Sequence, residues 1–257
     1  NTFINSLIKL NIFLLRKFCK NRLIYLNIFN IEGIALIKAL VFDVFGTVVD
    51  WRTSVIEECN SLEKHTGISG DWEKLTDMWR QNYMPSMDKV RNGEREWVNL
   101  DTLHKESLIN ILKELNITGL TDENIDHLNK SWHRLKPWSD VVEGLNLLKS
   151  KYSISTLSNG GIDLLSNMAI KQNLPWDNIF SAETFLHYKP DPETYLGAAK
   201  ILKLLPEEVM LVAAHNQDLL AAKKYGLKTA FVLRSNEYGP NQDFDLEADE
   251  KIDVSAS

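Results

Sequence analysis

Cysteine is scarce in this chain, which holds only Cys19 and Cys59 among its 257 residues. Two cysteines cannot build the disulfide framework that stabilises small secreted domains, and they cannot form a four-cysteine zinc site. We therefore expect a protein of a reducing compartment, and the cytoplasm is the default prediction for its location.

Glycine and proline are also few, and the start of the chain lacks a long apolar run. The 12 Gly and 7 Pro residues exclude a collagen-like protein and a Pro/Gly-rich disordered one. In residues 1–36 the longest uncharged stretches are roughly ten residues, whereas a membrane-spanning helix needs about 20 apolar residues. We therefore predict no membrane partner.

Basic residues are outnumbered by acidic ones, 29 to 35, which gives a net charge of −6. The imbalance is uneven, because residues 1–36 contain five Lys or Arg and a single Glu. The acidic excess of the remaining chain is therefore larger than the net value suggests. Such a surface repels phosphate backbones, and we predict that nucleic acid is not a partner.

Residues 1–36 also differ from the rest in composition, since Asn and Ile each occur six times in the first 31 positions. Three interpretations of this segment stay open: an upstream extension, an organellar targeting peptide, and a structural helix. A targeting peptide is usually rich in serine, and Ser6 is the only serine here. No expectation below depends on the segment.

From residue 37 onward, short apolar or β-branched runs alternate with amphipathic stretches. Strands are predicted at 39–43, 152–157, 180–183, 209–214 and 228–232, and the helices between the later strands at 140–149, 162–172, 192–202 and 217–225. This alternation predicts an α/β fold, with a doubly wound, Rossmann-like parallel sheet covered by helices on both faces.

The stretch from 52 to 134 contains only helical patterns. Helices are predicted at 52–65, at 71–91 with a kink or a split at Pro85, at 100–115 and at 121–134. An all-α cap is therefore inserted after the first strand. We expect residues 37–53 and 137–240 to form the catalytic core, 54–136 the helical cap, and 241–257 a loose acidic tail.

Polar residues stand where the predicted strands end, and in such sheets ligands bind beyond the carboxyl ends of the strands. These residues are Asp43, Ser158, Asn159, Lys189, His215 and Asp218. Singly, most have a structural explanation: Ser158 as a helix cap, Lys189 in a surface salt bridge, His215 as a core histidine. Their convergence on one edge indicates a functional site.

Four segments carry a resemblance to a known family. Residues 42–47 (Phe-Asp-Val-Phe-Gly-Thr), 158–160 (Ser-Asn-Gly), 189–191 (Lys-Pro-Asp) and Asp218 occur in this order and resemble the four motifs of the haloacid dehalogenase superfamily. The resemblance covers about residues 37–234. It implies that Asp43 is a covalent nucleophile, in a superfamily whose members are mostly Mg²⁺-dependent phosphatases.

Three details favour dehalogenation over phosphate transfer. The phosphatases carry a second Asp two positions after the nucleophile, and here Phe45 cannot protonate a leaving group. The last motif, 213–218, offers a single acid where Mg²⁺ needs closely spaced carboxylates. Arg80, within Trp79-Arg80-Gln81, and Tyr195 resemble the (S)-2-haloacid dehalogenases.

We therefore predict a metal-independent hydrolase without cofactor. It converts short (S)-2-haloalkanoic acids to 2-hydroxy acids, with the haloacid and water as reactants. Two alternatives stay open: a small-molecule phosphatase of the same superfamily, and a catalytically silent binding relative. The aromatic-rich insert also suggests a homodimer.

The resemblance and the charges assign roles in the first half-reaction. Asp43 attacks C2 of the substrate and forms an ester, and Lys189 keeps Asp43 ionised. Ser158 and backbone N–H groups near Thr47 hold the substrate carboxylate. The other binding residues are Arg80 and Asn159, which receive the halide, together with Tyr195 and Asn216.

Water activation is the part of this scheme in which the chain departs from the family pattern. Many family members have a Ser and an Asn in the last motif where this chain has Ala213 and His215. A neutral imidazole, with an ordinary pKa near 6.5, can act as a base around pH 7. We favour His215 as the group that activates water, with Asp218 and a mere spacer role for His215 as alternatives.

Overall fold

The computed structural model describes residues 36–256. The three interpretations of residues 1–36 concern a segment that lies, except for Leu36, outside this range. Within it, no helix is both long enough and apolar enough to cross a membrane.

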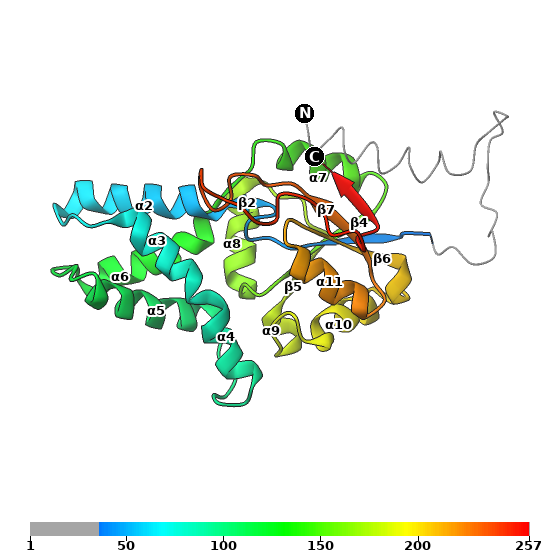
Figure 1. Cartoon of the computed structure of the whole chain (residues 1–257), viewed down its shortest axis with the longest axis horizontal. Coiled ribbons are helices and arrows are strands. Elements are labelled where there is room, and N and C mark those ends of the chain that lie inside the picture. The colour runs from blue at the N-terminus through cyan, green and yellow to red at the C-terminus, as the bar shows by residue number, and fades with distance from the viewer. Residues whose placement is uncertain (1–35, 257) are drawn as a thin grey trace.

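The centre of the molecule is a parallel sheet of six strands in the order β5-β4-β1-β6-β7-β8 (Figure 1). The strands are β1 (Ala39–Phe42), β4 (Ser153–Ser158), β5 (Asn178–Ser181), β6 (Val209–Ala213), β7 (Lys228–Val232) and β8 (Val254–Ala256). Every residue of β1 is buried, as expected for the apolar strand at the centre of a sheet covered on both faces.

Helices cover both faces of the sheet. They are α7 (Val141–Lys149), α8 (Ile162–Gln172), α9 (Ala182–Phe185), α10 (Pro192–Leu202) and α11 (Asn216–Lys224), with a 3₁₀ turn η2 (Pro206–Glu208) before β6. Leu40 and Phe42 belong to one hydrophobic cluster with residues of α7 and α8, whereas Val41 belongs to another with residues of α10 and α11. This alternation of faces confirms the predicted doubly wound core.

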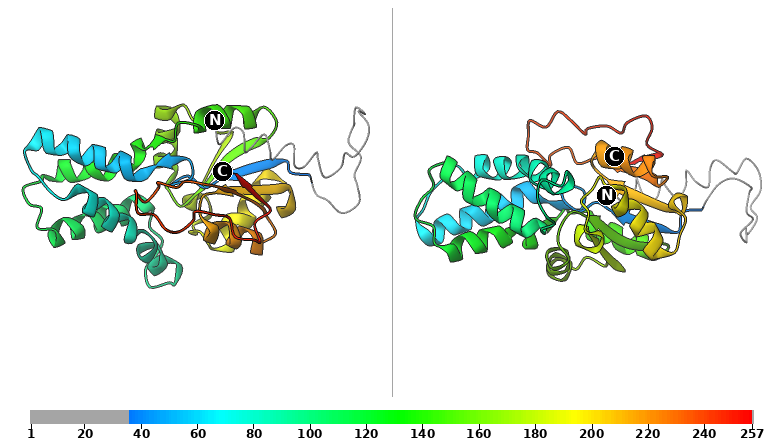
Figure 2. Two further views of the ribbon diagram at one scale, coloured as in Figure 1. Left: turned by 45° about the horizontal axis from the view of Figure 1, so that its top comes forward. Right: turned by 90° about the horizontal axis from the view of Figure 1, so that it is seen from below.

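The cap is entirely helical and lies to one side of the sheet (Figures 1 and 2). It contains α2 (Trp51–Thr66), α3 (Trp72–Gln81), α4 (Tyr83–Arg91), α5 (Leu100–Glu114), α6 (Asp122–Asn129) and the 3₁₀ helix η1 (Lys130–Arg134). The predicted split of this helix occurs, but at Asn82 and not at Pro85. Pro85 lies in the first turn of α4, where its missing N–H leaves no helical bond unmade.

A two-stranded antiparallel ribbon joins cap and core, formed by β2 (Val49–Asp50) and β3 (Lys136–Pro137). Strands of two residues leave no periodic pattern in a sequence, so the ribbon was not predicted. The numerical boundaries given above for core and cap stay predictions.

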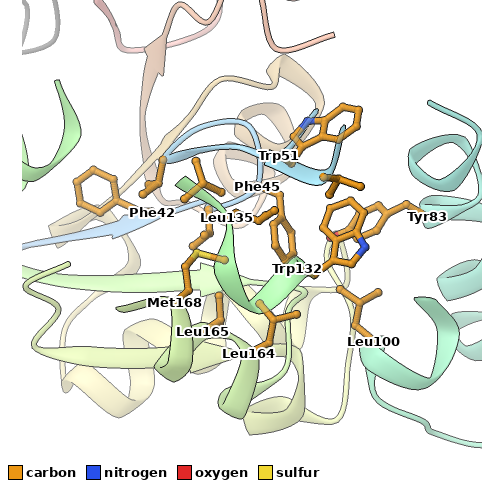
Figure 3. Packing of buried hydrophobic residues seen from close by; sticks show 14 of the residues in the cluster. Phe42, Phe45, Trp51, Tyr83, Leu100, Trp132, Leu135, Leu164, Leu165 and Met168 are labelled. Carbon is orange, nitrogen blue, oxygen red and sulfur yellow. The ribbon is translucent and has the colours of Figure 1, made fainter. Parts of the chain in front are cut away.

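Cap and core share one hydrophobic cluster (Figure 3). Phe45, two residues after Asp43, packs edge-on against Tyr83 and Trp132, with ring centroids 6.2 and 5.7 Å apart. Trp51, the first residue of α2, stacks on Trp132 at 6.2 Å. The loop that follows β1 is therefore fixed by aromatic side chains of the cap.

The expectation of a loose C-terminal tail is wrong for the described residues. Val254–Ala256 forms β8 and pairs with β7, and the Asp253 carboxylate accepts hydrogen bonds from the backbone N–H and the hydroxyl of Thr229. Between β7 and β8 the segment reaches toward the cap before it returns to the sheet (Figures 1 and 2). Asp245 and Asp253 in this segment have specific hydrogen-bond partners, which composition alone does not reveal.

Candidate active site

A cavity of about 670 Å³ lies where the carboxyl ends of the strands face the cap. Seven of the ten predicted site residues line it: Asp43, Arg80, Asn159, Lys189, Tyr195, His215 and Asp218. They come from the loops after β1, β4 and β6, from the loop between α9 and α10, from α10 and α11, and from α3 of the cap. The rule that ligands bind at the carboxyl edge of a doubly wound sheet therefore located the cavity.

The two carboxylate oxygens of Asp43 contact different groups of residues. On the first, which we call the lysine side, Asp43 Oδ1 accepts a hydrogen bond from Lys189 Nζ at 2.9 Å. Lys189 also donates to Asp218 Oδ2, and the Tyr195 hydroxyl donates to Asp218 Oδ1 at 2.7 Å. Asn159 supports the lysine, because its Oδ1 accepts from the Lys189 backbone N–H at 2.7 Å.

These charges keep Asp43 ionised. Burial opposes the carboxylate form of Asp43, but the positive charge of Lys189 and a hydrogen bond from His215 outweigh it, so the pKa of Asp43 lies well below its usual range. Burial likewise opposes the charge of Lys189, and Asp218 and Asp43 outweigh it, so the pKa of Lys189 is raised. An ionised carboxylate is the form that can act as a nucleophile.

On the second side, the histidine side, Asp43 Oδ2 accepts from the Thr47 hydroxyl at 2.8 Å and lies 3.2 Å from His215 Nδ1. His215 Nε2 lies 2.9 and 3.0 Å from the two carboxylate oxygens of Glu237. The imidazole is thus held between two carboxylates.

This position changes the expected charge of His215. Burial lowers the pKa of His215, but Glu237 and Asp43 outweigh it, so the pKa is raised well above its ordinary value. The sequence predicts a neutral His215 ring near pH 7, and the structure differs. With both carboxylates ionised the ring is instead an imidazolium, so it cannot accept a proton in this state.

Sequence reasoning missed Glu237. Its side chain is 1% exposed, and besides His215 it contacts the Trp51 indole N–H, which donates to Oε1 at 2.9 Å. A usable signal existed, because Glu237 follows the carboxyl end of β7, the same kind of position as the other site residues. No sequence motif marks Glu237.

Arg80 faces the same cavity from α3. Its guanidinium lies over the rings of Tyr83 and Trp51, 4.5 and 5.4 Å from their centroids, and 3.8 Å from Glu237 Oε1. Its buried Nη1 has no hydrogen-bond partner among residues 36–256. A buried cation with an unused donor can receive an anion.

Three predicted site residues do not line the cavity. The Thr47 hydroxyl donates a hydrogen bond to Asp43 Oδ2 and accepts one from the Ala214 backbone N–H. Ser158 is 2% exposed, and its hydroxyl accepts from the Gly160 N–H. Asn216 is turned to the C-terminal segment, where it bonds Asp245 and the backbone of Glu247 and Asp249. This geometry gives no support to substrate binding by the Asn216 side chain.

Phe45 fills the place where the phosphatases of the superfamily carry their second Asp. It is 2% exposed, and a Cβ at Gly160 would lie 3.1 Å from its ring. Within the described chain, one group of side chains has the spacing of a metal site: His187, Asp191 and Glu193. None of the three lines the cavity, and Asp191 is paired with Arg91 at 2.8 Å.

Comparison with known proteins agrees with this site. The sequence model of the haloacid dehalogenase-like hydrolases matches residues 37–226, and the chain belongs to that family, as its motifs predicted. The (S)-2-haloacid dehalogenase 1 of Pseudomonas sp. (strain CBS-3) is 29% identical over 204 residues, which is 78% of this chain and 86% of the relative.

Two solved structures are more similar in sequence. The L-2-haloacid dehalogenase PA0810 is 48% identical, with a TM-score of 0.84, over 86% of this chain and 94% of that one. The defluorinating L-2-haloacid dehalogenase Rha0230 is 45% identical, with a TM-score of 0.83, over 85% of this chain and 90% of that one. The protein is thus a hydrolase of this family.

Proposed function

We propose that this protein hydrolyses short (S)-2-haloalkanoic acids to 2-hydroxy acids through an ester on Asp43. One arrangement carries the proposal: a buried, ionised Asp43 shares a cavity with Arg80, whose Nη1 has no hydrogen-bond partner among the described residues. A nucleophile and an anion acceptor in one cavity suit a displacement that releases an anion. The names of the relatives supply the substrate class.

In the first half-reaction an Asp43 oxygen attacks C2 and the carbon–halogen bond breaks, with inversion at C2. Lys189 neutralises the charge around Asp43, so the anionic substrate can approach. The halide leaves toward Arg80 and Asn159, whose N–H donors stabilise it. Halide is a stable anion, which is why Phe45 in place of an acid costs the reaction nothing.

The second half-reaction begins with an uncharged ester. Because Asp43 has lost its charge, His215 has lost one of the two carboxylates that favour the imidazolium. Its Nδ1 proton passes to solvent, and the neutral ring accepts a proton from water as the oxygen attacks Asp43 Cγ. The bond from Cγ to the product oxygen breaks, and the enzyme returns to a carboxylate and an imidazolium.

The direct test is halide release from each enantiomer of 2-chloropropionate, with and without EDTA. The (S) enantiomer should be consumed and the (R) enantiomer spared, at a rate that EDTA leaves unchanged. Because one neighbour is described as defluorinating, 2-fluoropropionate belongs in the same assay. Absence of halide release from every 2-haloacid would refute the proposal.

Phosphatase activity is the competing function, and metal is the discriminating variable. Turnover of p-nitrophenyl phosphate with Mg²⁺, or recovery of activity by Mg²⁺ after chelation, would favour a phosphatase. Phe45→Asp alone should not create a good phosphatase, because the last motif still has one acid, Asp218. A chain inactive in both assays would be a binding relative.

A further inference from the structure

Glu237 is a buried acid to which the reaction scheme proposed above assigns no role. It lies in the loop after β7, is 1% exposed, and is reached by His215, by Trp51 and, at 3.8 Å, by Arg80. Burying a carboxylate is costly unless it is paired. Glu237 is paired with His215, which also contacts Asp43 Oδ2.

The backbone opposite Glu237 leaves room for its carboxylate. Gly46 has φ +86°, and a Cβ there would lie 2.0 Å from Glu237 Oε1. Any other residue at position 46 would displace the carboxylate and would also strain the turn. Trp51 fixes the same oxygen from the side of the cap, by its hydrogen bond of 2.9 Å.

The contacts of His215 change during the proposed reaction. In the resting enzyme, Asp43 holds Nδ1 and Glu237 holds Nε2. When Asp43 becomes an ester, its carboxylate no longer holds the ring through a charged contact. Among the described residues that bond His215, Glu237 is then the remaining carboxylate.

We propose that Glu237 is the positioning residue of the hydrolytic half-reaction: it holds the His215 ring by Nε2–H, so that Nδ1 faces the Asp43 ester. This inference rests on the proposed function. A carboxylate that accepts from Nε2–H fixes the tautomer in which Nδ1 carries the lone pair. Water that attacks Asp43 Cγ then has its base on the correct side.

The proton balance needs no further reactant. The imidazolium releases its Nδ1 proton to solvent after the halide has left, and Nδ1 later takes one proton from the attacking water. Cleavage of the ester restores the Asp43 carboxylate, and the remaining water proton leaves on the product hydroxyl. Glu237 stays ionised throughout and keeps Nε2–H.

The test separates the two half-reactions in Glu237→Gln. Halide release in the first turnover should stay within about threefold of the wild-type rate, whereas ester hydrolysis should slow by on the order of 10²-fold. The expected result is a stoichiometric burst of halide followed by slow turnover, and the ester adduct on Asp43 should be detectable by intact mass. Glu237→Asp keeps a carboxylate and should turn over faster than the Gln variant.

Asp253→Asn is the matched control, since it removes another carboxylate of the C-terminal segment whose partners are Thr229 and Lys223. It should change neither half-reaction. If Glu237→Gln slows both half-reactions by the same factor, or slows neither, the positioning role is overturned while the proposed function stands. A wild-type enzyme that releases no halide overturns the proposed function itself.

A spectroscopic readout on the wild type does not depend on variants that fold. In enzyme labelled with ¹⁵N-histidine, His215 Nε2 should carry a proton both at rest and during turnover with saturating substrate. A ring protonated only at Nδ1 during turnover would overturn the proposal.

Discussion

The two sides of Asp43 are built differently. On the lysine side, a chain of hydrogen bonds joins Asp43 to Lys189, Lys189 to Asp218, and Asp218 to Tyr195. These groups satisfy one another before any substrate binds. On the histidine side, His215 is held between two carboxylates, one of which changes during the proposed reaction.

This difference suggests a division of labour. The lysine side keeps the nucleophile ionised, and its charges stay the same through both half-reactions. Both Lys189 and His215 lose the charge of Asp43 when the ester forms, but Lys189 keeps its proton beside Asp218, whereas the imidazolium of His215 gives one up in the proposed scheme. Three kinds of substitution should therefore have different effects on the two half-reactions: those at Asp43, those on the histidine side, and those in the cap.

The largest effect is expected at the residue that both sides share. Asp43→Asn keeps the size of the side chain but removes the nucleophile, so halide release should fall by at least ~10⁴-fold. The variant should also form no adduct detectable by intact mass. Halide release within tenfold of the wild-type rate would mean that Asp43 is not the nucleophile.

His215→Ala should break the histidine side alone. The first turnover should release about one equivalent of halide, and later turnover should fall by roughly 10²- to 10⁴-fold, the usual contribution of a general base. Quenched-flow halide assays with intact mass measure both quantities. His215→Asn, which restores the residue commoner in the family, is the companion variant, and its full activity without a burst would make His215 a spacer.

The pH profiles of the two half-reactions should separate the sides in the wild type. The pKa of Asp43 is well below its usual range and that of Lys189 is raised, so the halide burst should be flat from pH 5 to 9. Ester hydrolysis needs neutral His215, so its rate should rise with pH, about tenfold per unit below the apparent pKa. A burst that fails below pH 6 would contradict the first assignment.

A smaller effect is expected from the cap. Arg80→Lys keeps the charge but loses the planar fork that faces Tyr83 and Trp51, so kcat for halide release should fall roughly tenfold. Ester hydrolysis, measured on the accumulated adduct, should change less. Unchanged kcat/KM would make Arg80 a structural charge.

The sequence predicted the lysine side well, for a physical reason. Asp43, Lys189 and Asp218 follow three strands of one parallel sheet, and the sheet itself brings such positions together. The strand expected at 180–183 is β5 at Asn178–Ser181, a shift of two residues that does not move the edge.

The histidine side was predicted only in part. His215 was found from its motif, but its charge depends on Glu237, which comes from a loop whose path no local pattern encodes. The turn of Asn216 away from the cavity has the same origin, because Asp245 and the backbone near it bind its amide. Contacts made by an irregular segment depend on tertiary packing, which composition and periodicity do not report.

The most direct test of the ester on Asp43 is a single turnover in H₂¹⁸O with enzyme in excess over (S)-2-chloropropionate. The product of the first turnover should carry unlabelled oxygen, since its hydroxyl oxygen comes from Asp43, and the label should appear in the Asp43 carboxylate. Labelled product in that first turnover would show direct attack by water and would contradict the account.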